Sequence, residues 1–114
     1  MSFDFSSLPP ASADLAQAGR HAERAVAQAP AQAEAWRALS QVRYRQQRLH
    51  EAEDAIDTAL QLAPDRLDSL RQLGWILIAQ QRLGHAELAF LRVQALAPDD
   101  PVALLELAEV RLRA

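Results

Sequence analysis

Apolar side chains recur along this chain at the spacing of amphipathic helices and never alternate as they would in a strand. Trp36, Leu39 and Val42 share one face of one segment, and Ala52 and Ile56 share a face of the next. Prolines after the first, third and fifth of these segments forbid helix continuation. Helices are therefore predicted near residues 11–28, 33–46, 50–62, 67–80, 84–96 and 101–113, and the expected fold class is all-α.

The pattern repeats every 34 residues without a gap. Three sets of residues recur at this period. They are the prolines Pro30, Pro64 and Pro98, the leucines Leu39, Leu73 and Leu107, and the small residues Ser40, Gly74 and Ala108. Each unit is a pair of helices, which buries its apolar face only by stacking on neighbouring pairs. The period divides the chain into a flexible N-terminal segment (1–10), a half repeat (11–30), two full repeats (33–66 and 67–100) and a final half repeat (101–114).

Each full unit places a large residue, a leucine, a small residue, an alanine, a bulky apolar residue and a proline in that order. The residues are Trp36, Leu39, Ser40, Ala52, Ile56 and Pro64 in the first unit and Leu70, Leu73, Gly74, Ala86, Phe90 and Pro98 in the second. This pattern resembles the tetratricopeptide repeat. Arg43 and Leu77 depart from it, because the family has a tyrosine there. The resemblance implies a helix–turn–helix solenoid, a right-handed superhelix of about six helices.

Composition agrees with helices and narrows the function. Of the 114 residues, 24 are alanine and 18 leucine, and only 3 are glycine. A net charge of −3 argues against a nucleic-acid-binding surface. The absence of cysteine excludes disulfides and thiol chemistry. No apolar stretch is long enough to span a bilayer, so the expected location is cytoplasmic. Arginine without lysine, together with abundant alanine, indicates a GC-rich, bacterial genome.

No group of residues predicts catalysis or metal binding. His50-Glu51 lacks the second histidine of a zinc-protease helix, and His85-x-Glu87 lacks the cysteines of a zinc deaminase. Ser40 lies in the core pattern with no base beside it. We therefore expect neither an enzyme nor a cofactor.

Polar and aromatic side chains that the core pattern leaves unexplained gather on the first helix of each pair. By resemblance, these positions line a concave peptide-binding groove. The predicted groove residues are Arg37, Gln41, Tyr44, Arg45, Arg71, Gln72, Trp75 and Ile78. Trp75 either binds a ligand or packs on a neighbouring helix. Arginine pairs with carboxylates and aromatic rings supply anchors, so the expected ligand is a peptide with acidic and apolar residues.

Family members that bind chaperones clamp a terminal carboxylate with lysine and asparagine. Here Arg37, Gln41 and Gln72 lie near the clamp positions, but Val102 and Glu106 stand where basic residues are required. The sequence therefore argues against a carboxylate clamp.

The function expected from these features is a non-catalytic scaffold or adaptor for protein partners. Two alternatives stay open: a small secretion or export chaperone, and the N-terminal recruiting segment of a larger enzyme such as a glycosyltransferase or sulfotransferase.

Both ends of the chain carry further apolar residues. Phe3 and Phe5 lie in the N-terminal segment, which is either a free tail or a ligand for the chain's own groove. The last predicted helix adds four apolar residues to its core positions Leu104 and Leu107, namely Val102, Leu105, Val110 and Leu112. A terminal repeat usually has a polar outer face. The apolar residues therefore predict self-association, a bound partner or the edge of a longer array.

Overall fold

The computed structural model describes residues 11–114, and the predicted N-terminal segment lies outside these residues. It contains six helices and, within the described residues, no strand. They are α1 (Ala11–Gln28), α2 (Ala33–Arg45), α3 (Leu49–Leu62), α4 (Leu67–Ala79), α5 (Leu83–Leu96) and α6 (Pro101–Arg113). Each boundary falls within one residue of its prediction, so the all-α fold is confirmed.

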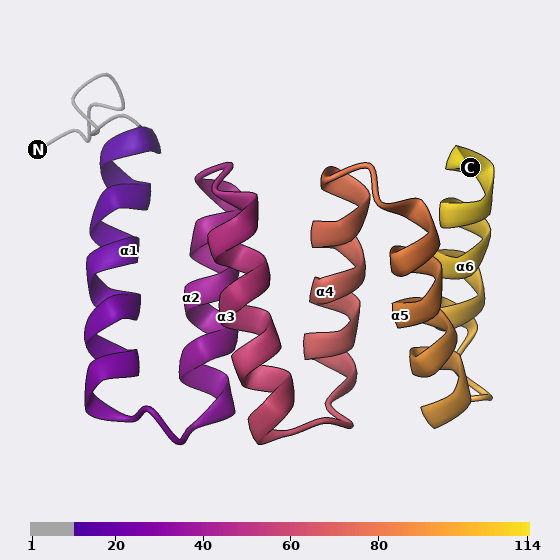
Figure 1. Cartoon of the computed structure of the whole chain (residues 1–114), viewed down its shortest axis with the longest axis horizontal. Helices are drawn as coiled ribbons and strands as arrows, with labels where there is room; N and C mark the ends of the chain where they lie inside the picture. Colours follow the sequence, from indigo (N-terminus) through magenta and orange to yellow (C-terminus); the bar gives the residue numbers. More distant parts are fainter. Residues whose placement is uncertain (1–10) are drawn as a thin grey trace, which may run out of the picture.

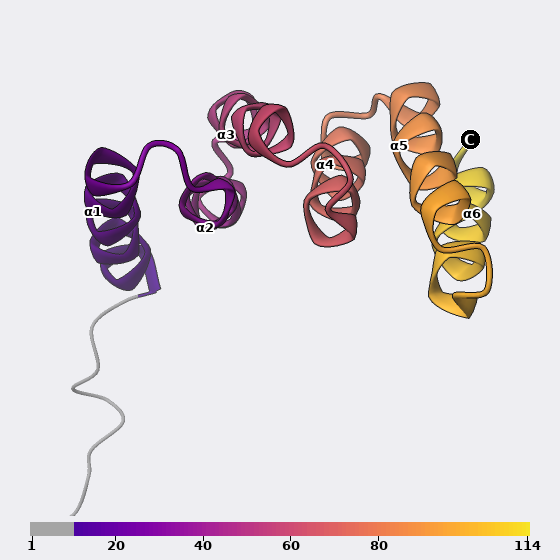
Figure 2. The same cartoon turned by 90° about the horizontal axis from the view of Figure 1, so that it is seen from below.

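The helices form a single row in chain order (Figure 1). Seen along the helices, α2 and α4 lie on one side of the row and α3 and α5 on the other (Figure 2). Consecutive helices pack against one another along the whole row. Side chains of α2 and α4 therefore share one surface, although they are about one period apart in sequence.

The turns inside the helix pairs depend on left-handed backbone at equivalent glutamines. Gln47 has a φ of 64° and Gln81 a φ of 63°. After each, a backbone N–H bonds back to the preceding helix: Arg48 N donates to Arg43 O and Arg82 N to Leu77 O, both at 2.9 Å. This is the usual geometry of a helix C-terminus, where glycine is the commoner residue. Glutamine gave no sequence signal for it.

Close packing between paired helices explains the small residues of the repeat. A Cβ atom on Gly74 would lie 2.5 Å from Cζ of Phe90, whose ring is fully buried. In the first pair the buried Ser40 hydroxyl donates to Ala52 O at 2.7 Å. Ser40 thus lies where α2 meets α3, and Gly74 lies where α4 meets α5.

Three residues differ from their predicted environments. Ile78 and Val110 are only 6 % and 1 % exposed and join a cluster with Phe90 between α4, α5 and α6. Ile78 is therefore a core residue and not part of a groove, and Val110 is not part of a C-terminal interface. The reason is that α4 is covered by α6 as well as by its flanking second helices. Conversely, Leu104 was expected in the core and is exposed.

Candidate functional site

A hollow of about 420 Å³ lies between α2 and α4, on the side of the row that these two helices share. Six of the eight predicted groove residues line it, and Asp68 is the seventh lining residue. The six are Gln41, Tyr44 and Arg45 from α2 and Arg71, Gln72 and Trp75 from α4. Arg37 lies beside the hollow in an ion-pair network, and Ile78 lies in the core.

Carboxylates already neutralise Arg37 at one edge of the hollow. Its guanidinium pairs with Glu34, and its Nε lies 3.4 Å from Asp68. Arg66 joins both acids, at 3.0 Å from Glu34 and 2.7 Å from Asp68. The Arg37 hydrogen bond lowers the pKa of Glu34. Burial alone would raise the pKa of Asp68, but the Arg66 hydrogen bond and charge lower it below its ordinary value.

Arg71 is also paired with carboxylates, and these ion pairs link α4 to α6. Its Nε donates to Glu106 Oε1 at 2.8 Å and its Nη2 to Asp100 Oδ2 at 2.6 Å. Asp100 also caps α6 by accepting from Val102 N at 2.9 Å. That bond and Arg71 together hold the pKa of Asp100 below its ordinary value. Arg37 and Arg71, which were expected to pair with acidic residues of a ligand, are therefore paired with acids of the chain itself.

Arg45 differs from both, because no carboxylate of the described residues lies within ion-pair distance of its guanidinium. Its side chain is exposed at the rim, beside exposed Gln41 and half-buried Tyr44. Gln72 is held in place, since its Nε2 donates to Arg37 O at 3.1 Å and links α4 to α2. Arg45 is thus the arginine of this hollow that has no carboxylate partner among the described residues.

Of the two roles that the sequence left open for Trp75, the structure shows packing on a neighbouring helix. Its ring meets Phe90 edge to face, with ring centroids 5.6 Å apart and an interplanar angle of 72°. The half-buried side chain also lines the hollow opposite Tyr44. The contact with Phe90 holds the indole in one orientation at the wall of the hollow.

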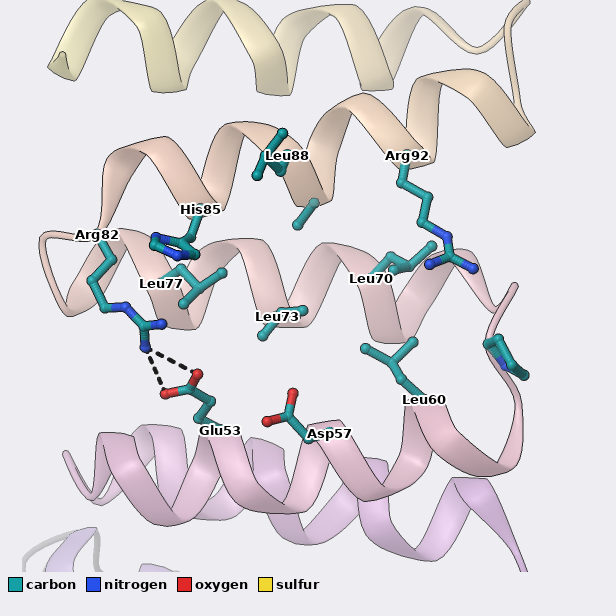
Figure 3. Close-up of a pocket in the computed structure, with 12 residues that line it drawn as sticks. Glu53, Asp57, Leu60, Leu70, Leu73, Leu77, Arg82, His85, Leu88 and Arg92 are labelled. Atoms are coloured by element: carbon teal, nitrogen blue, oxygen red, sulfur yellow. Dashed lines mark hydrogen bonds and ion pairs between the residues drawn. The ribbon is translucent and has the colours of Figure 1, made fainter.

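A second hollow, of about 350 Å³, lies on the opposite side of the row between α3 and α5 (Figure 3). Leu70, Leu73 and Leu77 of α4 form its floor. At one end Arg82 Nη1 donates to both carboxylate oxygens of Glu53, at 2.9 and 3.0 Å. No sequence signal indicated this hollow, because its walls come from two helices that the predictions did not place side by side.

Asp57 lies within this second hollow, and burial raises its pKa, with further contributions from Glu53 and Asp54. Because the folded protein binds this proton more tightly than the unfolded chain, the protein loses stability as the pH rises from the unfolded pKa through the folded pKa, and the full cost is present above it. We expect Asp57→Asn to raise stability at neutral pH by about 0.5 kcal/mol, a small gain because burial is only partial and water screens the charge. Thermal melts should show the gain vanishing below the ordinary aspartate pKa. Asp99→Asn, at an exposed position, should change little at either pH.

Comparison with known proteins identifies the repeat. The sequence profile described as Tetratricopeptide repeat matches residues 11–66 and 38–101, which together span most of the chain. The chain belongs to the tetratricopeptide repeat family. No curated protein matches it.

Solved tetratricopeptide repeat domains share the fold. One is the first such domain of Spaghetti (RPAP3) bound to the HSP90 peptide SRMEEVD, with a TM-score of 0.81 at 19% identity over 89% of this chain and 80% of that one. Another is the second domain of human RPAP3 in complex with the HSP70 peptide SGPTIEEVD, with a TM-score of 0.77 at 22% identity over 85% and 81%. Among helices of residues 11–114, none has the length and apolar character needed to cross a membrane.

Proposed function

We propose that this tetratricopeptide repeat protein is an adaptor that binds a peptide segment of a partner protein in the α2–α4 hollow. The observation that carries the proposal is the meeting of Tyr44, Arg45 and Trp75, from two helices, around one open hollow of about 420 Å³. Tyrosine, tryptophan and arginine are the residue types that dominate binding energy at protein interfaces. The peptide complexes of the similar domains support the same use of this fold.

The expected ligand chemistry depends on which arginines near the hollow lack a carboxylate partner. Arg37 and Arg71 are paired with acids of the chain itself, whereas Arg45 has no such partner among the described residues. We therefore expect an aromatic or aliphatic side chain between Tyr44 and Trp75, and an acidic residue beside it that pairs with Arg45.

The hollow does not favour a peptide held by its terminal carboxylate. Glu106 stands where a clamp requires a basic residue, and its carboxylate pairs with Arg71 at 2.8 Å. An unpaired acidic terminus would be repelled there. The peptide SRMEEVD, which the Spaghetti domain binds, is therefore expected to bind this chain weakly.

Selection of displayed random peptides against the protein provides a ligand for the test. Titration calorimetry with a selected peptide should show that Arg45→Glu weakens binding about tenfold or more, equal to about 1.4 kcal/mol. Arg20→Glu, on the exposed surface of α1, makes the same change in net charge and should bind as the wild type does. Equal losses in both variants would point to net charge alone, and full affinity in Arg45→Glu would place the ligand elsewhere.

A further inference from the structure

The exposed side of α6 has the residue pattern of a helix that packs on another helix. The period makes three α6 residues equivalent to α4 residues that pack on α5: Leu104 to Leu70, Ala108 to Gly74 and Arg111 to Leu77. Leu70 is 3 % exposed, whereas Leu104 is 51 % exposed. Ala108 and Arg111 are exposed too. α6 is thus the first helix of a repeat, and the described residues contain no second helix beside it.

α1 shows the reverse situation, because it corresponds to the second helix of a repeat. Its Ala18, Ala22 and Ala25 are equivalent to residues of α3 that pack on α2. The outer side of α1 has a shallow hollow of about 210 Å³ that includes His21 and Ala25. At these two positions α3 has Ala55 and Ala59, both buried. The described residues contain no first helix that covers this side of α1.

We infer that two copies of the chain associate head to tail, with α1 of one copy on α6 of the next, so that the two half repeats complete one repeat. The α4–α5 contacts give the register: Leu70 packs with Val93, Gly74 with Phe90 and Leu77 with Ala86. Shifted by the period, they place Leu104 on Ala25 of the second copy, Ala108 on Ala22 and Arg111 on Ala18. Ala22 is only 6 % exposed within its own chain, so the contact adds little to its burial. The contact therefore repeats a packing that the chain already uses twice.

Side-chain size permits a close approach in this register. The paired residues are Gly74 with Phe90, Ser40 with Ile56 and, between copies, Ala108 with Ala22. Two alanines occupy less volume than either pair inside the chain. The α6 helix and the α1 helix of the second copy must therefore lie closer together than the helices of a pair to form a close-packed contact.

Charge also fits this register. Asp14 is equivalent to Arg82, whose backbone N–H bonds to Leu77 O at 2.9 Å. Arg111 is equivalent to Leu77, so Asp14 of the second copy approaches Arg111 with the opposite charge. Among residues 11–114, Arg111 pairs with Glu87 alone, in an exposed ion pair of 3.1 Å. The contact is expected to be weak, because the α1 surface is mostly alanine with His21 in place of a buried alanine.

The two copies contribute different surfaces, so a pair leaves one α1 and one α6 open for further copies. Sedimentation of the full chain from low micromolar to several hundred micromolar should therefore show a mean mass that rises beyond that of a dimer. A symmetric contact through α6 alone would stop at a dimer. A wild-type chain that stays monomeric throughout would overturn the inference.

Two variants block opposite ends: Ala108→Arg on α6 and His21→Arg on α1, both at exposed positions. Each alone should remain monomeric, whereas an equimolar mixture should form dimers, because each variant retains the end that the other lacks. Ala95→Arg makes the same change at an exposed position of α5 and should associate as the wild type does. If His21→Arg associates fully while Ala108→Arg does not, the contact is symmetric and the head-to-tail arrangement is wrong. Circular dichroism melts verify that every variant is folded.

Discussion

Gly74→Leu is expected to leave the protein unfolded at room temperature. Even the first carbon of a side chain at this position would lie 2.5–2.9 Å from three atoms of the Phe90 ring. The ring is fully buried against Leu77 and Val110, so it has no free volume to enter. Displacing a buried phenylalanine costs about 3–5 kcal/mol, a large part of the stability of a small domain. Circular dichroism should show loss of the helical signal.

Smaller changes separate this clash from a general effect of replacing glycine. Gly74→Ala should cost about 1–2 kcal/mol, because overpacking exceeds the gain in helix propensity. Adding Phe90→Leu to Gly74→Ala should recover part of that loss. Gly84→Ala has no atom within 4 Å of the new Cβ and should be neutral or slightly stabilising. A melting temperature unchanged by Gly74→Leu would show that Phe90 does not lie over Gly74.

The second large effect is expected at Arg71, the residue that joins α4 to α6. Arg71→Ala removes the partner of Glu106, whose side chain is only 9 % exposed and accepts from Arg71 at 2.8 Å. A buried carboxylate left without its cation is strongly destabilising. We expect a loss of about 2 kcal/mol, at the lower end because Arg71 itself is partly open to water. Urea unfolding provides the measurement.

A variant that also removes the Glu106 carboxylate tests whether its unpaired charge causes this loss of stability. Arg71→Met combined with Glu106→Leu replaces the pair by apolar side chains and should restore most of the stability. Arg92→Ala breaks an exposed pair with Asp65 at 3.2 Å and should change stability by less than about 0.5 kcal/mol. If Arg71→Ala proved as mild as Arg92→Ala, Arg71 would be free for ligands and the groove would be more basic than described above.

Most of the fold could be predicted from the sequence because its signals are local. Helical spacing, the alanine–proline steps and the 34-residue period placed every helix end within one residue. The left-handed Gln47 and Gln81 were not foreseen, since that backbone usually selects glycine. Ile78 was placed in the groove because helical spacing shows which residues share a face but not that α6 covers part of α4.

The candidate site was predicted in its residues but not in its charges. Helical spacing selected the side chains outside the core on each first helix, and the family resemblance implied that they share one groove; six of them line the hollow. The Arg37–Glu34 pair lies within one helix and could have been found from its spacing, whereas the Arg71 pairs depend on contacts between repeats. Arg71 with Glu106 and Arg37 with Gln72 are each 35 positions apart, one more than the period. This spacing brings adjacent first helices into contact, so a search at the period plus one would have found both links.

The two tryptophans provide the most direct test of the proposed groove. Trp75 lines the α2–α4 hollow, whereas Trp36 lies outside it and its Nε1 donates to Pro30 O at 2.8 Å. The chain has no other tryptophan. In an NMR titration with a selected peptide, binding in the groove should shift the indole N–H signal of Trp75 and leave that of Trp36 in place. Saturating peptide that leaves the Trp75 signal unmoved, while resonances of α3 and α5 shift, would contradict the proposal and place binding on the opposite side of the row.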